Sequence, residues 1–232
     1  MTTTVRAVPG FLPSSAGFHF ANRWPRGPAL VLGARVPGPV PLTFKLGIGD
    51  AAYGLCGGMA LAVLDLWASG VVPPPDREPP AAGSPLFRAI VRRQVDSLEW
   101  GLAVWRFYRA AAAAPQGRAR LTVRDTWPAV RRAIDAGRPT AVGLIHVASA
   151  DPRALGANHQ VVVHGYELDA VAGHVTLSVY DPNHPDDDTI RLGITLAGPR
   201  GPVAFSYLDR EAPVLGLVPL RSTRGRHRDG SG

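Results

Sequence analysis

The hydrophobic pattern changes its period at Pro139, and this change limits the possible folds more than any other feature of the chain. Before Pro139 the long apolar segments have helical spacing, whereas after it short β-branched runs are separated by turn residues. The sequence therefore predicts an α+β fold in which a helical lobe precedes an antiparallel β-sheet lobe. Six runs are predicted as strands: 140–147, 159–167, 174–180, 189–194, 203–208 and 214–220.

Three helices are predicted in the first half. Residues 54–67 are apolar nearly all round, which is typical of a helix buried in a core, and Gly70 ends it. Residues 86–114 are predicted as a long helix, continuous or broken. A third helix is predicted over residues 125–136, with Gly137 after its last turn.

The 232 residues are expected to form one domain over 1–220, built from two lobes around one core. Its parts are an extended N-terminal segment over 1–49, which prolines and glycines interrupt, a helical lobe over 50–138 and a sheet lobe over 139–220. Residues 221–232 carry arginines among serine, threonine and glycine, which predicts a flexible basic tail. A cleft is expected between the lobes.

Composition and charge exclude several classes of function. Hydrophobic residues make up 46% of the chain and charged residues 19%, the balance of an ordinary globular protein. The net charge of +7 comes almost wholly from scattered arginines, since Lys45 is the only lysine, so no nucleic-acid partner is expected. No window holds eighteen uninterrupted apolar residues, so no membrane span is expected. A single cysteine cannot form an intramolecular disulfide, and a cytoplasmic location is expected.

No cofactor or metal is expected either. The acidic residues between Asp181 and Asp188 lack the glycine of a calcium loop, and Pro185 stands at a ligand position. The histidines have no recognised zinc spacing. No glycine-rich loop is followed by Lys-Ser or Lys-Thr, which argues against nucleotide binding.

Cys56 stands where the buried helix is predicted to begin, and this position favours a thiolate. Unpaired N–H groups and the helix dipole stabilise negative charge there. Gly54, Gly57 and Gly58 are predicted to leave the backbone uncovered, so that a substrate carbonyl can approach and receive a hydrogen bond. The alternative is a small cysteine buried in the core.

His159 is the preferred base for this thiol. It opens the strand 159–167 and shares a face with Val161 and Val163, whereas His164 faces the other way by strand alternation. A base on a strand of the sheet lobe could reach a thiol at the start of a helix across the cleft. His146, at the end of a strand, is the second choice.

Asp181 is the candidate third member of the set, which would orient the imidazole. It directly follows the strand 174–180, and an antiparallel neighbour of the 159–167 strand would bring it near His159. Asn183 competes for this role because an amide can also orient a histidine. The other interpretation of Asp181 is an ordinary turn aspartate before Pro182.

With these residues in view, the chain resembles the papain-like cysteine peptidase clan, and especially its bacterial branch similar to the C39 peptidases. The resemblance spans about residues 45–195 and implies a papain-like fold, with the cysteine-bearing helix packed on the sheet lobe. It also implies a Cys-His-Asp order and acyl transfer through a thioester. The matching segments are Gly54-Leu55-Cys56-Gly57-Gly58-Met59, Gly137-Arg138-Pro139, residues 158–167 and Val179-Tyr180-Asp181-Pro182-Asn183.

One position departs from that clan's pattern. Asp50 stands six residues before Cys56, where the clan has a glutamine whose amide donates to the oxyanion. A carboxylate would repel an oxyanion, so Gln160 or Asn158 is expected to replace that donor. The function predicted is cleavage of a peptide or amide bond. An acyltransferase with the same triad and a binding module with impaired catalysis remain the alternatives.

Overall fold

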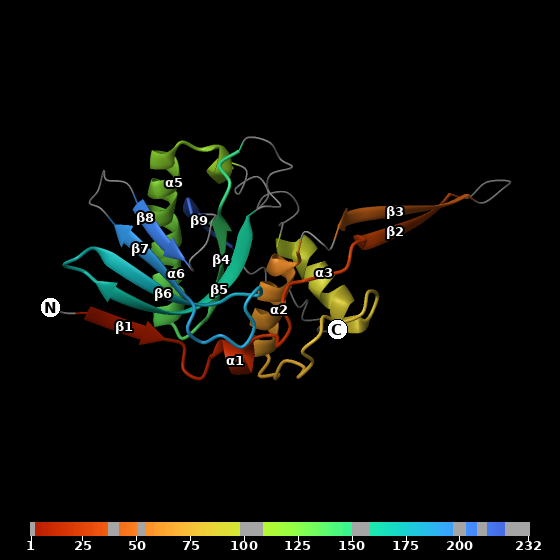
Figure 1. The fold of residues 1–232 in the computed structure, drawn as a ribbon, viewed down its shortest axis with the longest axis horizontal. Helices are drawn as coiled ribbons and strands as arrows, with labels where there is room; N and C mark the ends of the chain where they lie inside the picture. Colours follow the sequence, from red (N-terminus) through yellow and green to blue (C-terminus); the bar gives the residue numbers. More distant parts are fainter. Residues whose placement is uncertain are drawn as a thin grey trace, which may run out of the picture.

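A curled antiparallel sheet forms the centre of the computed structural model (Figure 1). The structure describes residues 3–36, 42–50, 54–97, 109–149, 158–196, 203–207 and 213–220, and for 28–36 and 42–50 it describes the backbone. The fold mixes helices and strands, and the predicted change of character at Pro139 is confirmed by the strands that follow it. The predicted basic tail at 221–232 lies outside the described residues.

The sheet contains seven strands within the described residues, in the order β8-β7-β6-β5-β4-β9, with β1 paired to β5. Every pair of neighbours is antiparallel. All six predicted strands are present, with ends displaced by a few residues. Their bounds are β4 Thr140–Ile145, β5 His159–Asp169, β6 His174–Tyr180, β7 Arg191–Leu196, β8 Val203–Tyr207 and β9 Gly216–Pro219.

The N-terminal segment contributes more than the extended chain that was expected. Strand β1 (Thr3–Ala7) pairs along the second half of β5, and helix α1 (Pro13–Ala16) follows it. Strands β2 (Pro28–Val36) and β3 (Leu42–Asp50) form a separate hairpin that projects from the body in Figure 1. Proline and glycine frequency misled the prediction here, because both residues also occur at strand ends and turns.

Two helices lie beside the start of β5. Helix α2 (Cys56–Ala68) begins at the cysteine and buries eight consecutive residues, Gly57 to Leu64, as its uniformly apolar sequence predicts. Helix α3 (Pro85–Ser97) packs against α2. It forms the first part of the helix predicted over 86–114, of which residues 98–108 lie outside the described part.

The third predicted helix is longer than expected and irregular. It begins as α5 (Pro115–Leu121), continues as a π-helical turn, η3 (Thr122–Thr126), and ends as α6 (Trp127–Asp135). The irregular turn immediately precedes Pro128, which has no N–H to donate to the carbonyl four residues earlier. Thr122 and Thr126 bond the N–H and carbonyl of Leu217, so the turn holds the outer edge of β9.

The core lies between the sheet and the helices on its two faces (Figure 1). In the register of β4 with β5, Gly143 pairs with Gln160, whose side chain lies against α2, whereas Val142 faces the α5–α6 side. Tyr166 packs edge-on against Trp127 of α6. No helix within the described residues is long and apolar enough to cross a membrane.

Candidate active site

Cys56 is the first residue of α2, as the sequence predicts, and its side chain is partly exposed. No acidic residue lies in the first turn of this helix, so nothing there opposes negative charge on the sulfur. The N-terminal end of a helix stabilises an anion through its dipole and unpaired N–H groups. The local backbone therefore offers hydrogen-bond donors to a negatively charged group at this position.

Two of the four N–H groups around this helix start are already bonded to side chains. The Leu55 N–H donates to Asn22 Oδ1 at 2.7 Å, and the Gly58 N–H donates to Gln94 Oε1 at 2.7 Å. The N–H groups of Cys56 and Gly57 have no side-chain acceptor among the described residues. These two groups are therefore the backbone donors available to an oxyanion that forms at Cys56.

His159 opens β5 and is buried, with 7% of its surface exposed. Its Nε2 lies 2.6 Å from Asp181 Oδ1, and the Cys56 side chain is close enough to the ring to raise its pKa. Since Nε2 is engaged by the carboxylate, Nδ1 is the ring nitrogen left for the thiol. The structure thus brings together Cys56, His159 and Asp181, three residues that the sequence analysis singled out.

Asp181 follows β6 directly and is fully buried. Besides His159, its carboxylate accepts hydrogen bonds from the Asn183 N–H at 2.8 Å and from the Tyr207 hydroxyl at 2.5 Å. Three donors therefore compensate the burial of this charge. Tyr207 was missed by sequence reasoning, because a tyrosine at the end of β8 has no motif that marks it as a partner of Asp181.

The pKa values of this pair shift in opposite directions. Burial lowers the pKa of His159, but the negative charge and hydrogen bond of Asp181, together with the Cys56 contact, outweigh it and raise the pKa to about 10. Burial raises the pKa of Asp181, yet the His159 charge and the donors around the carboxylate hold it below its ordinary value. At neutral pH the site therefore contains an imidazolium and a carboxylate.

The supporting amides predicted from the sequence occupy three different places. Gln160 lies against Gly57 in the first turn of α2, and its buried Oε1 has no hydrogen-bond partner among the described residues. Asn158 accepts the backbone N–H groups of His146 and Val147, so it holds the end of β4. Asn183 bonds Asp181 through its backbone N–H, while its side chain accepts from Asn22.

Of the three predicted amides, Gln160 is the one whose side chain lies against the first turn of α2. Asn183 does not take the place of Asp181 as the partner of the imidazole, because His159 Nε2 contacts the aspartate. The second-choice base, His146, directs its Nδ1 toward the Pro213 carbonyl at 3.3 Å. Asp50 ends β3, where it pairs with Pro28, and the position of its side chain lies outside the description.

The glycines near Cys56 serve close packing, which corrects the prediction that they leave the backbone open to substrate. A Cβ on Gly57 would lie 2.3 Å from Gln160 Oε1, and one on Gly58 would lie 2.2 Å from the Ile90 carbonyl oxygen. Gly54 has φ +89°, and a Cβ there would lie 2.7 Å from Asn22 Nδ2. Neighbouring groups cover all three positions.

Two of the acidic residues after Asp181, Asp186 and Asp188, are bonded by the N-terminal segment, and Asp186 is also bonded by Arg77. Asp188 accepts the backbone N–H and hydroxyl of Ser14 at 2.9 and 2.7 Å. Asp186 contacts His19 at 2.5 Å and Arg77 at 3.2 Å. No cluster of three His, Cys, Asp or Glu residues suited to a metal ion occurs in the part of the chain that the structure describes.

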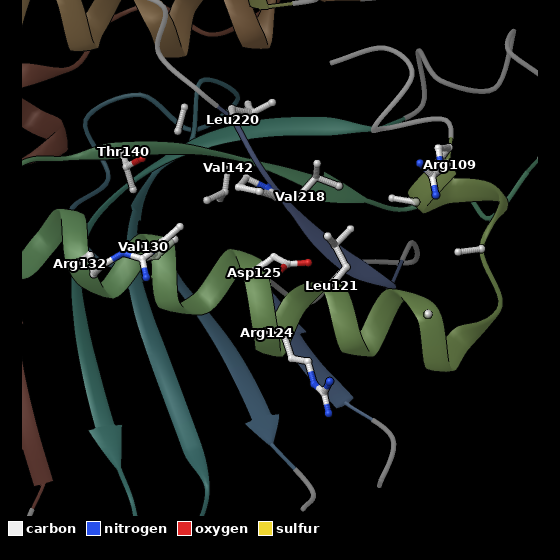
Figure 2. A pocket seen from close by; sticks show the side chains of 16 residues that line it. Arg109, Leu121, Arg124, Asp125, Val130, Arg132, Thr140, Val142, Val218 and Leu220 are labelled. Atoms are coloured by element: carbon white, nitrogen blue, oxygen red, sulfur yellow. The ribbon is translucent and has the colours of Figure 1, made fainter. Parts of the chain in front are cut away.

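A cavity of about 690 Å³ lies elsewhere, between the α5–α6 helical segment and strands β4 and β9 (Figure 2). Apolar side chains such as Val130, Val142 and Val218 form much of its wall. Asp125 lies between the helix and β9, whereas Arg124 extends away from the sheet (Figure 2). Neither Cys56 nor His159 lines this cavity.

Compared with known protein families, with curated protein sequences and with solved structures, the chain matches none.

Proposed function

We propose that this protein is a thiol-dependent hydrolase that cleaves a peptide or amide bond with Cys56, His159 and Asp181. The observation that carries the proposal is the 2.6 Å contact between the imidazole and the buried carboxylate, on a ring whose pKa the nearby Cys56 side chain also raises. The order of the three residues in the chain and the helix-on-sheet setting agree with a papain-like arrangement. A cytoplasmic location, inferred from the single cysteine, suits a free thiol.

The reaction begins with attack of the Cys56 sulfur on the substrate carbonyl carbon, which forms a C–S bond. The oxyanion faces the N–H groups of Cys56 and Gly57, and Gln160 lies beside them. His159 then gives its proton to the leaving amine as the C–N bond breaks, which leaves a thioester. Water attacks the thioester with His159 as base, and this step releases the acid and restores the thiol.

The pKa of His159, raised to about 10, supports its role as the proton donor in the first step. An imidazolium at neutral pH both stabilises the thiolate and holds the proton that the leaving group needs. Asp181 supports this by keeping Nε2 engaged, so that Nδ1 faces the sulfur.

Trapping of the thioester tests this proposal. Intact protein is mixed with a panel of activated acyl substrates, such as p-nitrophenyl esters of amino acids, and the mass of the protein is measured. We expect a mass increase equal to one acyl group, which hydroxylamine removes, in the natural protein and not in Cys56→Ala. Absence of the adduct across the panel would favour the binding module, in which the fold persists without turnover.

Adding an amine acceptor separates hydrolysis from acyl transfer. Both reactions share the thioester and differ in the molecule that intercepts it. A hydrolase is expected to release the free acid at the same rate when an amine such as glycine amide is present. Conversion of most of the acyl group to the new amide would assign the acyltransferase instead.

A further inference from the structure

Asn22 is hydrogen-bonded to two chain segments, one just before Cys56 and one just after Asp181. Its Oδ1 accepts the Leu55 N–H at 2.7 Å, one residue before Cys56. Its Nδ2 donates to Asn183 Oδ1 at 3.2 Å, and its backbone N–H donates to the Pro182 carbonyl at 2.8 Å. A single side chain and its own amide thus bond residues on both sides of the site.

The orientation of this side chain is itself held in place. Trp24 Nε1 donates to the same Oδ1 at 2.8 Å, so the carboxamide oxygen accepts two hydrogen bonds and the nitrogen must face Asn183. Gly54, at φ +89°, lies against Nδ2 without a Cβ that would displace it. This half-buried amide, held by these bonds, restricts the movement of the two segments that it connects.

We propose that Asn22 is a positioning residue, an inference that rests on the proposed function. It holds the segment before Cys56 at a fixed distance from the segment after Asp181, so that the three catalytic side chains can meet. His159 opens β5 and Asp181 directly follows β6, and the register of these neighbouring strands brings the two residues together. Cys56 belongs to a helix outside that sheet. Its position relative to the imidazole depends on the contacts of the helix start, of which Asn22 supplies one directly to Leu55.

Three variants separate this role from general packing. Asn22→Ala removes the side-chain hydrogen bonds of residue 22 to Leu55 and to Asn183. Asn183→Ala removes only the bond that Asn22 Nδ2 makes, and it leaves the Asn183 backbone N–H on Asp181. Ser14→Ala is the matched control, since it removes the hydroxyl's hydrogen bond from the same N-terminal segment to Asp188, keeps the backbone one, and touches neither residue 55 nor residue 181.

The readout is the rate at which iodoacetamide alkylates Cys56 in the folded protein, measured across pH, with melting temperature measured alongside. We expect Asn22→Ala to lower the rate near pH ~6 by about 10- to 100-fold, because a misplacement of about 1 Å can cost about 100-fold. Asn183→Ala should lower it by a smaller factor. Ser14→Ala should keep the natural rate even if its melting temperature falls as far as that of Asn22→Ala.

The outcomes distinguish this inference from the proposed function. If natural Cys56 already reacts slowly below the ordinary thiol pKa of about 8.5, the proposed function fails, and the positioning role falls with it. If natural Cys56 reacts fast and both Asn22→Ala and Asn183→Ala match it, Asn22 positions nothing and only the present inference is overturned. If Asn22→Ala does not fold, Asn183→Ala alone decides by the same criterion.

Discussion

His159 Nε2 lies 2.6 Å from Asp181 Oδ1, although 22 positions separate the two residues in the chain. Strands β5 and β6 create this contact: Val162 pairs with Tyr180, so the start of one strand meets the end of the other. Burial strengthens the attraction because little water screens it. Asp181 thereby orients the imidazole of His159, and the contact between them joins the ends of two neighbouring strands.

The first prediction concerns the reactivity of Cys56 in the variant His159→Ala. Removing the imidazolium should shift the alkylation profile toward higher pH, because the positive charge that stabilises the thiolate is lost. Alkylation by iodoacetamide reports this site alone, since the chain has one cysteine. His146→Ala is the control and should leave the profile unchanged. A profile that shifts with His146→Ala instead would move the base to His146.

Asp181→Asn should have a smaller effect on the same profile than His159→Ala. The amide still accepts a hydrogen bond from the ring, but it no longer supplies the charge that raises the pKa of His159. The midpoint for alkylation should therefore lie between those of the natural protein and of His159→Ala. A shift larger than that of His159→Ala would show that Asp181 does more than orient the imidazole and raise its pKa.

Tyr207→Phe should destabilise the protein by about 1–3 kcal/mol, because it removes a donor to a buried carboxylate. Tyr166→Phe is the matched control: that hydroxyl bonds Asp135, which is exposed, so its loss should cost about 0–1 kcal/mol. Urea unfolding measures both free energies. Equal losses would mean that burial of Asp181 does not set the energy of its hydrogen bond.

The stability of the protein should depend on pH through this pair. The pKa of Asp181 is held below its ordinary value of 3.8, so its contribution is present above about pH 4 and is lost on acidification. The pKa of His159 is raised from 6.5 to about 10, so its contribution is complete below pH 6.5 and is lost as pH rises toward 10.

Unfolding free energies measured from about pH 4 to 10 test this expectation. The natural protein should lose stability between pH 6.5 and about 10, and His159→Ala should have a flatter curve over that range. Parallel curves for the two proteins would contradict a raised pKa for His159.

Gly58→Ala should destabilise the protein more than Gly57→Ala. The new Cβ at residue 58 would lie 2.2 Å from a backbone oxygen of α3, so the two helices must separate, at a cost of about 1–3 kcal/mol. At residue 57 the Cβ meets the end of the Gln160 side chain, which can rotate away. The ~1 kcal/mol gain in helix propensity is common to both. Equal midpoints in chemical denaturation would contradict this difference.

The sequence by itself determined the local elements of the second half and two positions of the candidate site. A β-branched run bounded by turn residues is a local property, so the strand from His159 and the strand that ends before Asp181 were predicted almost to the residue. The uniformly apolar run after Cys56 likewise predicted a buried helix that begins at the cysteine. These features depend on neighbours within a few positions.

Only the tertiary structure decided which distant groups meet. Asn22 reaches Leu55 and Asn183, Tyr207 reaches Asp181, and β1 pairs with β5, and no pattern in the sequence links the members of these pairs. The glycines of α2 were assigned to substrate access, whereas packing against α3 and Gln160 explains Gly57 and Gly58. Such contacts are selected by the packing of whole elements and by the need to satisfy buried polar groups, and no local pattern encodes either.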